Sequence, residues 1–239
     1  MRHCVFCGGR ANSKEHAWPE WLLKLERPGR RVEWLRGLDA EEVLYIPNGE
    51  LRTGVVCKRC NNGWMDRIEQ SSRHVITAMH QNLSIPLDEE LQRIVALWTV
   101  KTTMVMEAFG KKDAPWFYEP VQRHAMREAH QIPERTGVWV GRYLGLHTPA
   151  WFAGPFGPTP EMTLGLSVTM TFGALSVHLV TLRADYNVPK VEGPWTDALA
   201  RVWPTTPGLI HWPPSVSFSD DGGGHVPLRR LVRRVLGDG

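Results

Sequence analysis

The four cysteines of this 239-residue chain form two pairs with the same spacing, Cys4-x-x-Cys7 and Cys57-x-x-Cys60. Two thiolates separated by two residues can reach one metal ion, and two such pairs supply the four ligands of a tetrahedral zinc site. Four cysteines are too few for the disulfide framework of a secreted protein of this length. We therefore expect a structural Zn²⁺ ion held by all four. A redox-active pair and simple burial of the thiols are the alternatives.

The residues around these pairs resemble the HNH endonuclease superfamily, also called ββα-metal or His-Me finger nucleases. The resemblance rests on the cysteine pairs, on Glu15-His16, and on Asn61 directly after the second pair, and it covers about the first third of the chain. It implies a two-stranded hairpin and a helix that hold one divalent cation. In that arrangement Glu15 and Asn61 are ligands of the catalytic ion, His16 is the general base, and the zinc ion is structural and separate.

These residue types suit the hydrolysis of a phosphodiester. An imidazole can deprotonate water near neutral pH, and a hard cation offsets the charge that builds on the phosphate. A carboxylate and an amide oxygen, such as those of Glu15 and Asn61, make a suitable half-shell for Mg²⁺ or Mn²⁺. We expect Asn61 to begin a helix, where the free amides of the first turn favour an anion.

Each of these residues also has an ordinary structural interpretation. His16 could be a surface or capping histidine and Glu15 a solvated carboxylate. Asn61 could form a turn or an N-cap, and its neighbour Asn62 could be the ligand instead. Lys58 and Arg59, within the second cysteine pair, could contact a phosphate or could simply occupy an exposed turn. Trp18, Trp21 and Trp64 could stack on bases but are more commonly core residues.

The chain divides near residue 80 into a predicted HNH-like domain, residues 1–80, and an α+β domain, residues 81–239. The first part holds 13 Lys and Arg against 10 Asp and Glu, and the second holds 15 of each, so the excess positive charge belongs to the first part. In the first part we expect a helix from Pro19, a polar stretch over 27–48, a strand over 51–56 and a helix over 65–79.

The fold class expected for the whole chain is α+β, with a zinc-stapled ββα-metal unit followed by helices and an antiparallel sheet. Spacing predicts helices over 89–109 and 121–130, and strands over 138–144, 164–171 and 174–182, the last two joined as a hairpin. Residues 227–236 predict a short basic amphipathic helix at the end of the chain. The Trp-rich remainder predicts either core or a pocket for a base, and we favour core.

We therefore expect a metal-dependent endonuclease that acts on nucleic acid, most simply DNA, and that could form a homodimer. The alternatives are a non-catalytic, zinc-stabilised nucleic-acid-binding protein built on the same scaffold, and a protein-interaction module. No phosphate-binding loop for a nucleotide cofactor is present, and no apolar run is long enough to span a membrane, so we expect a cytoplasmic protein.

Overall fold

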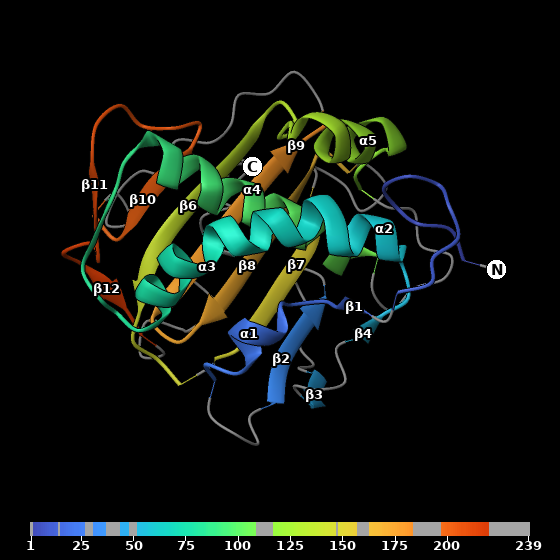
Figure 1. Ribbon diagram of the computed structural model, residues 1–239. Coiled ribbons are helices and arrows are strands. Elements are labelled where there is room, and N and C mark those ends of the chain that lie inside the picture. Colours follow the sequence, from blue (N-terminus) through green and yellow to red (C-terminus); the bar gives the residue numbers. More distant parts are fainter. Residues whose placement is uncertain are drawn as a thin grey trace.

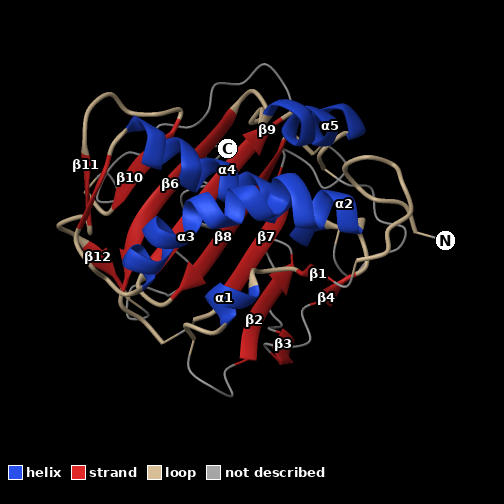
Figure 2. Ribbon diagram, viewed as in Figure 1, coloured by secondary structure: helices blue, strands red, loops and turns tan. Residues whose placement is uncertain are grey.

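The structure is a computed structural model, and it describes residues 2–13, 15–26, 31–36, 44–47, 52–108, 117–146, 148–156, 163–183 and 197–219. Its centre is a sheet covered on one face by two long helices (Figures 1 and 2). The prediction of an α+β protein built on a mostly antiparallel sheet is confirmed. The ββα-metal unit stays a prediction, and the basic helix over 227–236 lies outside the described residues.

The main sheet has eight strands among the described residues, and seven of them run in the order β10-β6-β9-β8-β7-β2-β3, with β12 beside β6. All neighbours are antiparallel except β2 with β7 and β12 with β6. The strands are β2 (Arg31–Arg36), β3 (Leu44–Pro47), β6 (Thr136–Tyr143), β7 (Ala150–Phe156), β8 (Gly165–Phe172), β9 (Leu175–Leu182), β10 (Leu199–Trp203) and β12 (Ser217–Phe218).

Strands β8 and β9 form the centre of this sheet and are the predicted hairpin. Both consist of buried residues along their whole length, and each pairs with a neighbouring strand on both sides. Gly173, in the turn between them, has a φ of +51°, and a Cβ atom there would lie 2.5 Å from the carbonyl oxygen of His80. A side chain would therefore disturb the contact of this turn with His80, the last residue of helix α3 (Asp66–His80).

The long helices are α3 (Asp66–His80) and α4 (Glu89–Glu107), and both lie across the same face of the sheet (Figure 1). Helix α4 begins where the side chain of Asp88 accepts a hydrogen bond of 2.8 Å from the amide of Leu91. It packs against α3 on one side and against β9 and β10 on the other, which explains its apolar character on most faces. A buried ion pair of 2.7 Å joins Lys101 of α4 to Glu69 of α3.

The shorter helices are α1 (Glu20–Leu23), α2 (Lys58–Cys60) and α5 (Pro120–Ala129), and a π-helical segment over Asn61–Met65 joins α2 to α3. Two small antiparallel pairs complete the fold: β1 (Glu15–His16) with β4 (Arg52–Thr53), and β5 (Ile85–Leu87) with β11 (Ile210–Trp212). None of the helices in these described segments is long and apolar enough to cross a membrane. The cytoplasmic location and the homodimer stay predictions.

The N-terminal segment packs against the sheet at several points. Strand β2 extends the sheet by pairing in parallel with β7. The ring of Trp18, fully buried, meets the ring of Phe172 of β8 edge to face at 4.7 Å. The buried carboxylate of Glu26 accepts hydrogen bonds from His80, Thr148 and the amide of Gly173. Residues 1–80 and 81–239 therefore share one hydrophobic core, and the division at residue 80 stays a prediction.

The sequence did not predict several strands. Strands β2 and β3 lie inside the stretch over 27–48, whose prolines and glycines suggested an irregular segment. The predicted strand over 51–56 shortens to β4, and residues 55 and 56 instead lead into the second cysteine pair. Strands β10, β11 and β12 lie in the Trp- and Pro-rich region, where each strand is short and its pairing partner is distant in the chain.

Candidate metal centre and its surroundings

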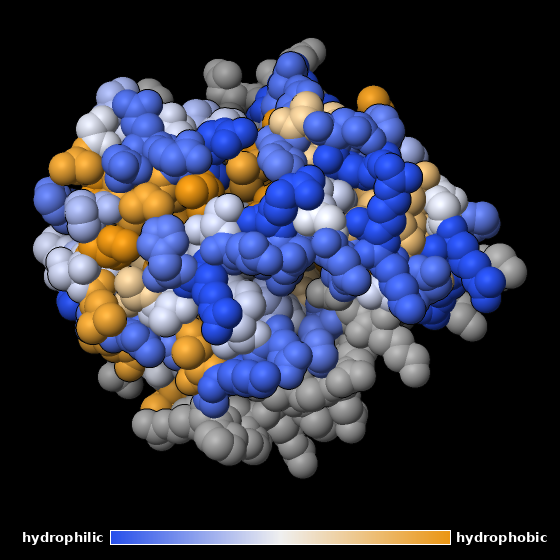
Figure 3. Space-filling view, in the orientation of Figure 1, coloured by the Kyte–Doolittle hydropathy of each residue, from blue (hydrophilic) through white to orange (hydrophobic). Residues whose placement is uncertain are grey.

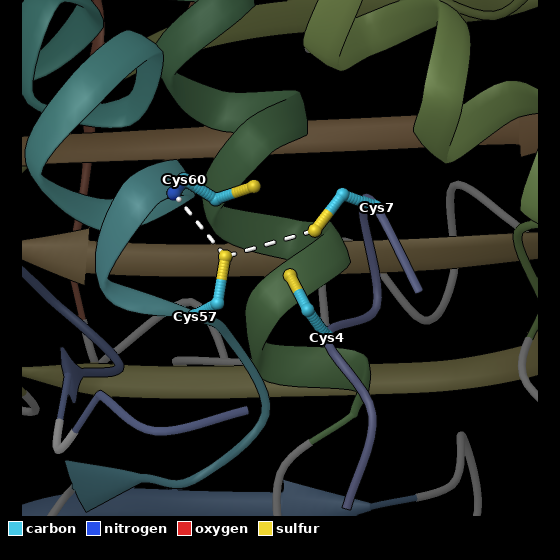
Figure 4. Close-up of side chains that lie close together, drawn as sticks. All are labelled: Cys4, Cys7, Cys57 and Cys60. Atoms are coloured by element: carbon cyan, nitrogen blue, oxygen red, sulfur yellow. Dashed lines mark hydrogen bonds between the residues drawn. The ribbon is translucent and has the colours of Figure 1, made fainter. Parts of the chain in front are cut away.

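The four cysteines come together as the sequence predicted. Their sulfur atoms all lie within 4.8 Å of one another, and the sulfur atoms of Cys7 and Cys57 are 3.6 Å apart (Figure 4). A tetrahedral zinc ion with Zn–S bonds of about 2.3 Å requires sulfur atoms about 3.8 Å apart, so this group fits the ion. All four cysteines are free thiols. The group can hold a metal ion such as zinc.

The local backbone positions each cysteine pair. Gly8 follows Cys7 with a φ of +71°, and its amide donates to the carbonyl oxygen of Cys4 at 2.9 Å, so the chain folds back after the first pair. In the second pair Cys57 caps α2: its sulfur accepts a hydrogen bond of 3.4 Å from the amide of Cys60 (Figure 4). The side chain of Asn12 accepts from the amide of Lys58 at 2.9 Å and so joins the two pairs.

The pKa values of the thiols shift in different directions. Burial raises the pKa of Cys60, with the charge of Cys4 as a second cause, and burial raises the pKa of Cys7. Burial acts in the same direction on Cys57, but hydrogen bonds from the Cys60 amide and from the other cysteines outweigh it and lower the pKa of Cys57 to about 7. A thiolate therefore forms more readily at Cys57 than at Cys7 or Cys60, and a bound cation would favour the thiolate form of its ligands.

Glu15 and His16 form β1, which runs beside the strand that leads to the second cysteine pair. Glu15 lies opposite Thr53 and His16 opposite Arg52. The pairing continues toward the cysteines, because the amide of Ser13 donates to the carbonyl oxygen of Val56 at 3.1 Å. The side chain of His16 is half-buried, whereas that of Glu15 lies outside the described part of the structure.

The sequence predicted that Asn61 begins the helix, and this prediction is wrong. Asn61 lies about one turn inside the helix, which begins at Lys58. Its amide already donates to the carbonyl oxygen of Cys57 at 3.0 Å, because the helix begins at Lys58 under the cap that Cys57 provides. Its side-chain nitrogen donates to the side-chain oxygen of Asn62 at 3.1 Å, which leaves the side-chain oxygen of Asn61 available to a cation. Asn61 is half-buried and Asn62 is exposed.

The other residues that the sequence singled out divide between surface and core. Lys58 and Arg59 are exposed, which agrees both with a phosphate contact and with a simple exposed turn. Trp18 and Trp64 are buried, and Trp21 is half-buried beneath the guanidinium of Arg73, 5.8 Å from the ring centroid. Among the tryptophans of the second part, Trp98, Trp139, Trp151 and Trp212 are buried and Trp203 is half-buried, whereas Trp195 lies outside the described residues.

A second site, which the sequence did not indicate, lies between α3 and α4. It is a surface hollow of about 270 Å³ whose lining includes Arg67 and Ser71 of α3, Arg93 and Glu90 of α4, and His130, which ends α5. Positions 67, 93 and 130 share no motif or period, so only the packing of three helices could bring them together. Figure 3 shows this face, which is hydrophilic along α3.

Comparison of the chain with protein-family models, with curated proteins and with solved structures found no match in any of the three. Arguments about function therefore depend on the site itself.

Proposed function

We propose that this protein is a metal-dependent endonuclease that hydrolyses phosphodiester bonds of DNA, with His16 as the general base and a structural zinc ion in the four-cysteine group. The observation that carries the proposal is the pairing of β1 with β4 immediately before the helix that begins at Lys58. Strands β1 and β4 pair although α1, β2 and β3 lie between them in the chain, helix α2 follows β4, and the four cysteines lie close together beside this pair.

This order brings the candidate residues into one small unit. The strand that carries Glu15 and His16 runs beside residues 52–56, and Asn61 follows the second cysteine pair within one helical turn. A kink follows at Asn61–Met65, where Gly63 departs from helical geometry with φ of −109° and ψ of −108°. The kink separates the turn that carries Asn61 from helix α3.

Each residue then has a defined role. His16 accepts the proton of the attacking water, and its half-buried position restricts access by bulk solvent. Glu15 and Asn61 supply oxygen atoms to a Mg²⁺ or Mn²⁺ ion, which offsets negative charge on the phosphate and the leaving oxygen when bound. Lys58 and Arg59, both exposed beside the zinc site, contact the flanking phosphates.

The test is cleavage of supercoiled plasmid by the full chain and by His16→Ala, with Mg²⁺, Mn²⁺ or no divalent ion, while bound zinc is measured in both proteins. We expect metal-dependent nicking by the wild type, a loss of at least about 100-fold in the variant, and equal zinc content. Equal cleavage by both proteins, or no cleavage with any of these ions, would contradict the proposal.

The second candidate is a zinc-stabilised nucleic-acid-binding protein without catalysis. The hollow between α3 and α4 favours it, since Arg67 and Arg93 lie apart from the Glu15-His16 strand and could bind phosphate without it. A wild type that binds DNA, retains zinc and cleaves nothing would identify this second function.

A further inference from the structure

The hollow between α3 and α4 concentrates cationic and hydrogen-bonding side chains at one place. Its polar lining consists of two arginines, one serine, one histidine and one glutamate, so formal positive charge exceeds negative charge. Ile68, Ile94 and Leu97 complete the wall. Within the described part of the chain, neither Arg67 nor Arg93 forms an ion pair. Both guanidinium groups therefore keep their donors for a ligand.

The pKa shift of His130 agrees with an excess of positive charge in the hollow. Burial lowers the pKa of His130, and the charges of Arg67 and Arg93 lower it further. Glu90, the one carboxylate among the described residues of the lining, is exposed, and the shift of the His130 pKa has burial, Arg67 and Arg93 as its causes. The potential at the imidazole is therefore positive, and His130 is neutral at neutral pH and can act as a donor or an acceptor.

The volume of the hollow and the arginine side chains in its lining limit the class of ligand that it can bind. A volume of about 270 Å³ lies just below the range of about 300–1,000 Å³ that encloses a drug-sized molecule, so the hollow suits one group of a larger ligand. Arginine donors match the oxygens of a phosphate in bidentate geometry.

We infer that this hollow binds a backbone phosphate of a nucleic acid, with Arg67 and Arg93 as charged donors and His130 as a neutral partner. Ser71 lines the hollow, but its hydroxyl donates to the carbonyl oxygen of Arg67 at 2.9 Å. The choice of a nucleic acid as the source of the phosphate rests on the proposed function, because α3 continues directly from the segment that holds Asn61.

The experiment measures binding without cleavage. Fluorescence anisotropy follows a labelled 20-base-pair DNA duplex with the full chain, without added divalent ions, between about 50 and 200 mM salt. The test variant is Arg67→Gln/Arg93→Gln. The control is Arg73→Gln/Arg201→Gln, which removes the same two positive charges. Arg73 lies in α3 and Arg201 in β10, both are exposed, and neither lines the hollow.

We expect the hollow variant to bind at least about tenfold more weakly, with a slope of log Kd against log salt lower by about 1, the value for one phosphate. The control should change affinity by less than about threefold. Equal weakening of both double variants would overturn the inference, because net charge alone would then explain the loss. The absence of measurable binding by the wild type would also overturn it.

A second arm distinguishes a free anion from a nucleic acid. Inorganic phosphate is added at constant ionic strength while thermal unfolding is followed. Stabilisation of the wild type but not of the hollow variant, with identical DNA binding by the two, would assign the hollow to free phosphate and overturn the nucleic-acid source. The single variant Arg67→Gln, at an exposed position, checks that lost binding does not come from misfolding. Because no step requires cleavage, failure of the nuclease proposal and failure of this one remain distinguishable.

Discussion

The sulfur atoms of Cys7 and Cys57 lie 3.6 Å apart, although 50 positions separate the two residues in the chain. A metal ion at this point closes a loop that contains β1, β2, β3 and β4, and the entropy of closing such a loop is large in the unfolded chain. The ion would thereby link the segment before the strand that carries His16 to the start of the helix that carries Asn61. Metal binding and the geometry of the candidate active site are therefore coupled.

Cys57→Ser should release the metal ion and destabilise the chain by at least about 3 kcal/mol, because the serine hydroxyl is a poor zinc ligand and the remaining thiols stay buried. Metal content by atomic absorption and thermal unfolding with and without chelator measure the effect. Lys58→Ser provides the control, since Lys58 is exposed between two ligands and should keep one metal ion per chain. Unchanged stability of Cys57→Ser in the presence of zinc would contradict a structural role for the ion.

Asn61→Ala and Asn62→Ala distinguish the two candidate ligands of the catalytic ion. Asn61 is half-buried with its side-chain oxygen available, whereas the side-chain oxygen of Asn62 accepts the hydrogen bond from Asn61. We expect Asn61→Ala to lower metal-dependent plasmid cleavage by about 100-fold and Asn62→Ala by less than about fivefold. Asn61→Asp, which keeps an oxygen ligand, should recover part of the activity. The reverse order of the two alanine variants would transfer the ligand role to Asn62.

The four-cysteine group could be predicted from the sequence because C-x-x-C spacing imposes a local geometry that tertiary packing only completes. Helix α4 was equally predictable, since Asp88 supplies a cap and its apolar residues recur at helical spacing. The pairing of Glu33 in β2 with Ala150 in β7 was not, because strand pairing over more than 100 positions leaves no periodic signal.

The hollow between α3 and α4 could not be predicted from the sequence either. Arg67 and Arg93 each look like an ordinary solvated arginine on an amphipathic helix, and His130 is a residue in left-handed conformation at the end of α5. Their significance comes from the packing of α3 against α4, which also depends on the ion pair between Lys101 and Glu69. Sequence patterns describe one helix face at a time and cannot show which faces meet.

Arg123→Met should destabilise the chain, and the loss should grow with pH. Arg123 is fully buried and bonds Glu107 at 2.7 Å, and the Glu107 carboxylate also accepts from the amide of Phe117. Burial raises the pKa of Glu107 from 4.5 to about 7, while the charge of Arg123 opposes that rise. Without Arg123 the folded-state pKa of Glu107 therefore rises further.

A carboxyl group whose folded pKa exceeds its unfolded pKa binds its proton more tightly in the folded state. Stability therefore falls as the pH rises from about 4.5 through the folded pKa, and the fall is larger in Arg123→Met than in the wild type. We expect a deficit of roughly 1–2 kcal/mol at pH 5 and about 3–5 kcal/mol at pH 8 in urea unfolding. Arg127→Met, which loses the partly exposed pair with Glu128 on the same helix, should show no such trend.

The fragment 81–239 should not fold by itself, because the N-terminal segment supplies part of its core. Removal of residues 1–80 takes β2 away from β7 and exposes the ring of Phe172 on which Trp18 packs. It also removes α3, which covers the sheet beside α4 (Figure 1). We expect the fragment to lack a cooperative thermal transition and the near-ultraviolet circular dichroism of the full chain.

The matching substitution in the full chain is Trp18→Ala, which should cost about 3–5 kcal/mol of unfolding free energy because the side chain is fully buried. Trp21→Ala, at a half-buried position on α1, should cost clearly less. A fragment that unfolds cooperatively, together with equal losses for the two tryptophan variants, would establish the boundary near residue 80 as a real domain boundary. A fragment without a cooperative transition, together with a larger loss for Trp18→Ala than for Trp21→Ala, would show that the metal centre and the sheet unfold as one cooperative unit. Loss of the ion in Cys57→Ser should then lower the unfolding temperature of the whole chain.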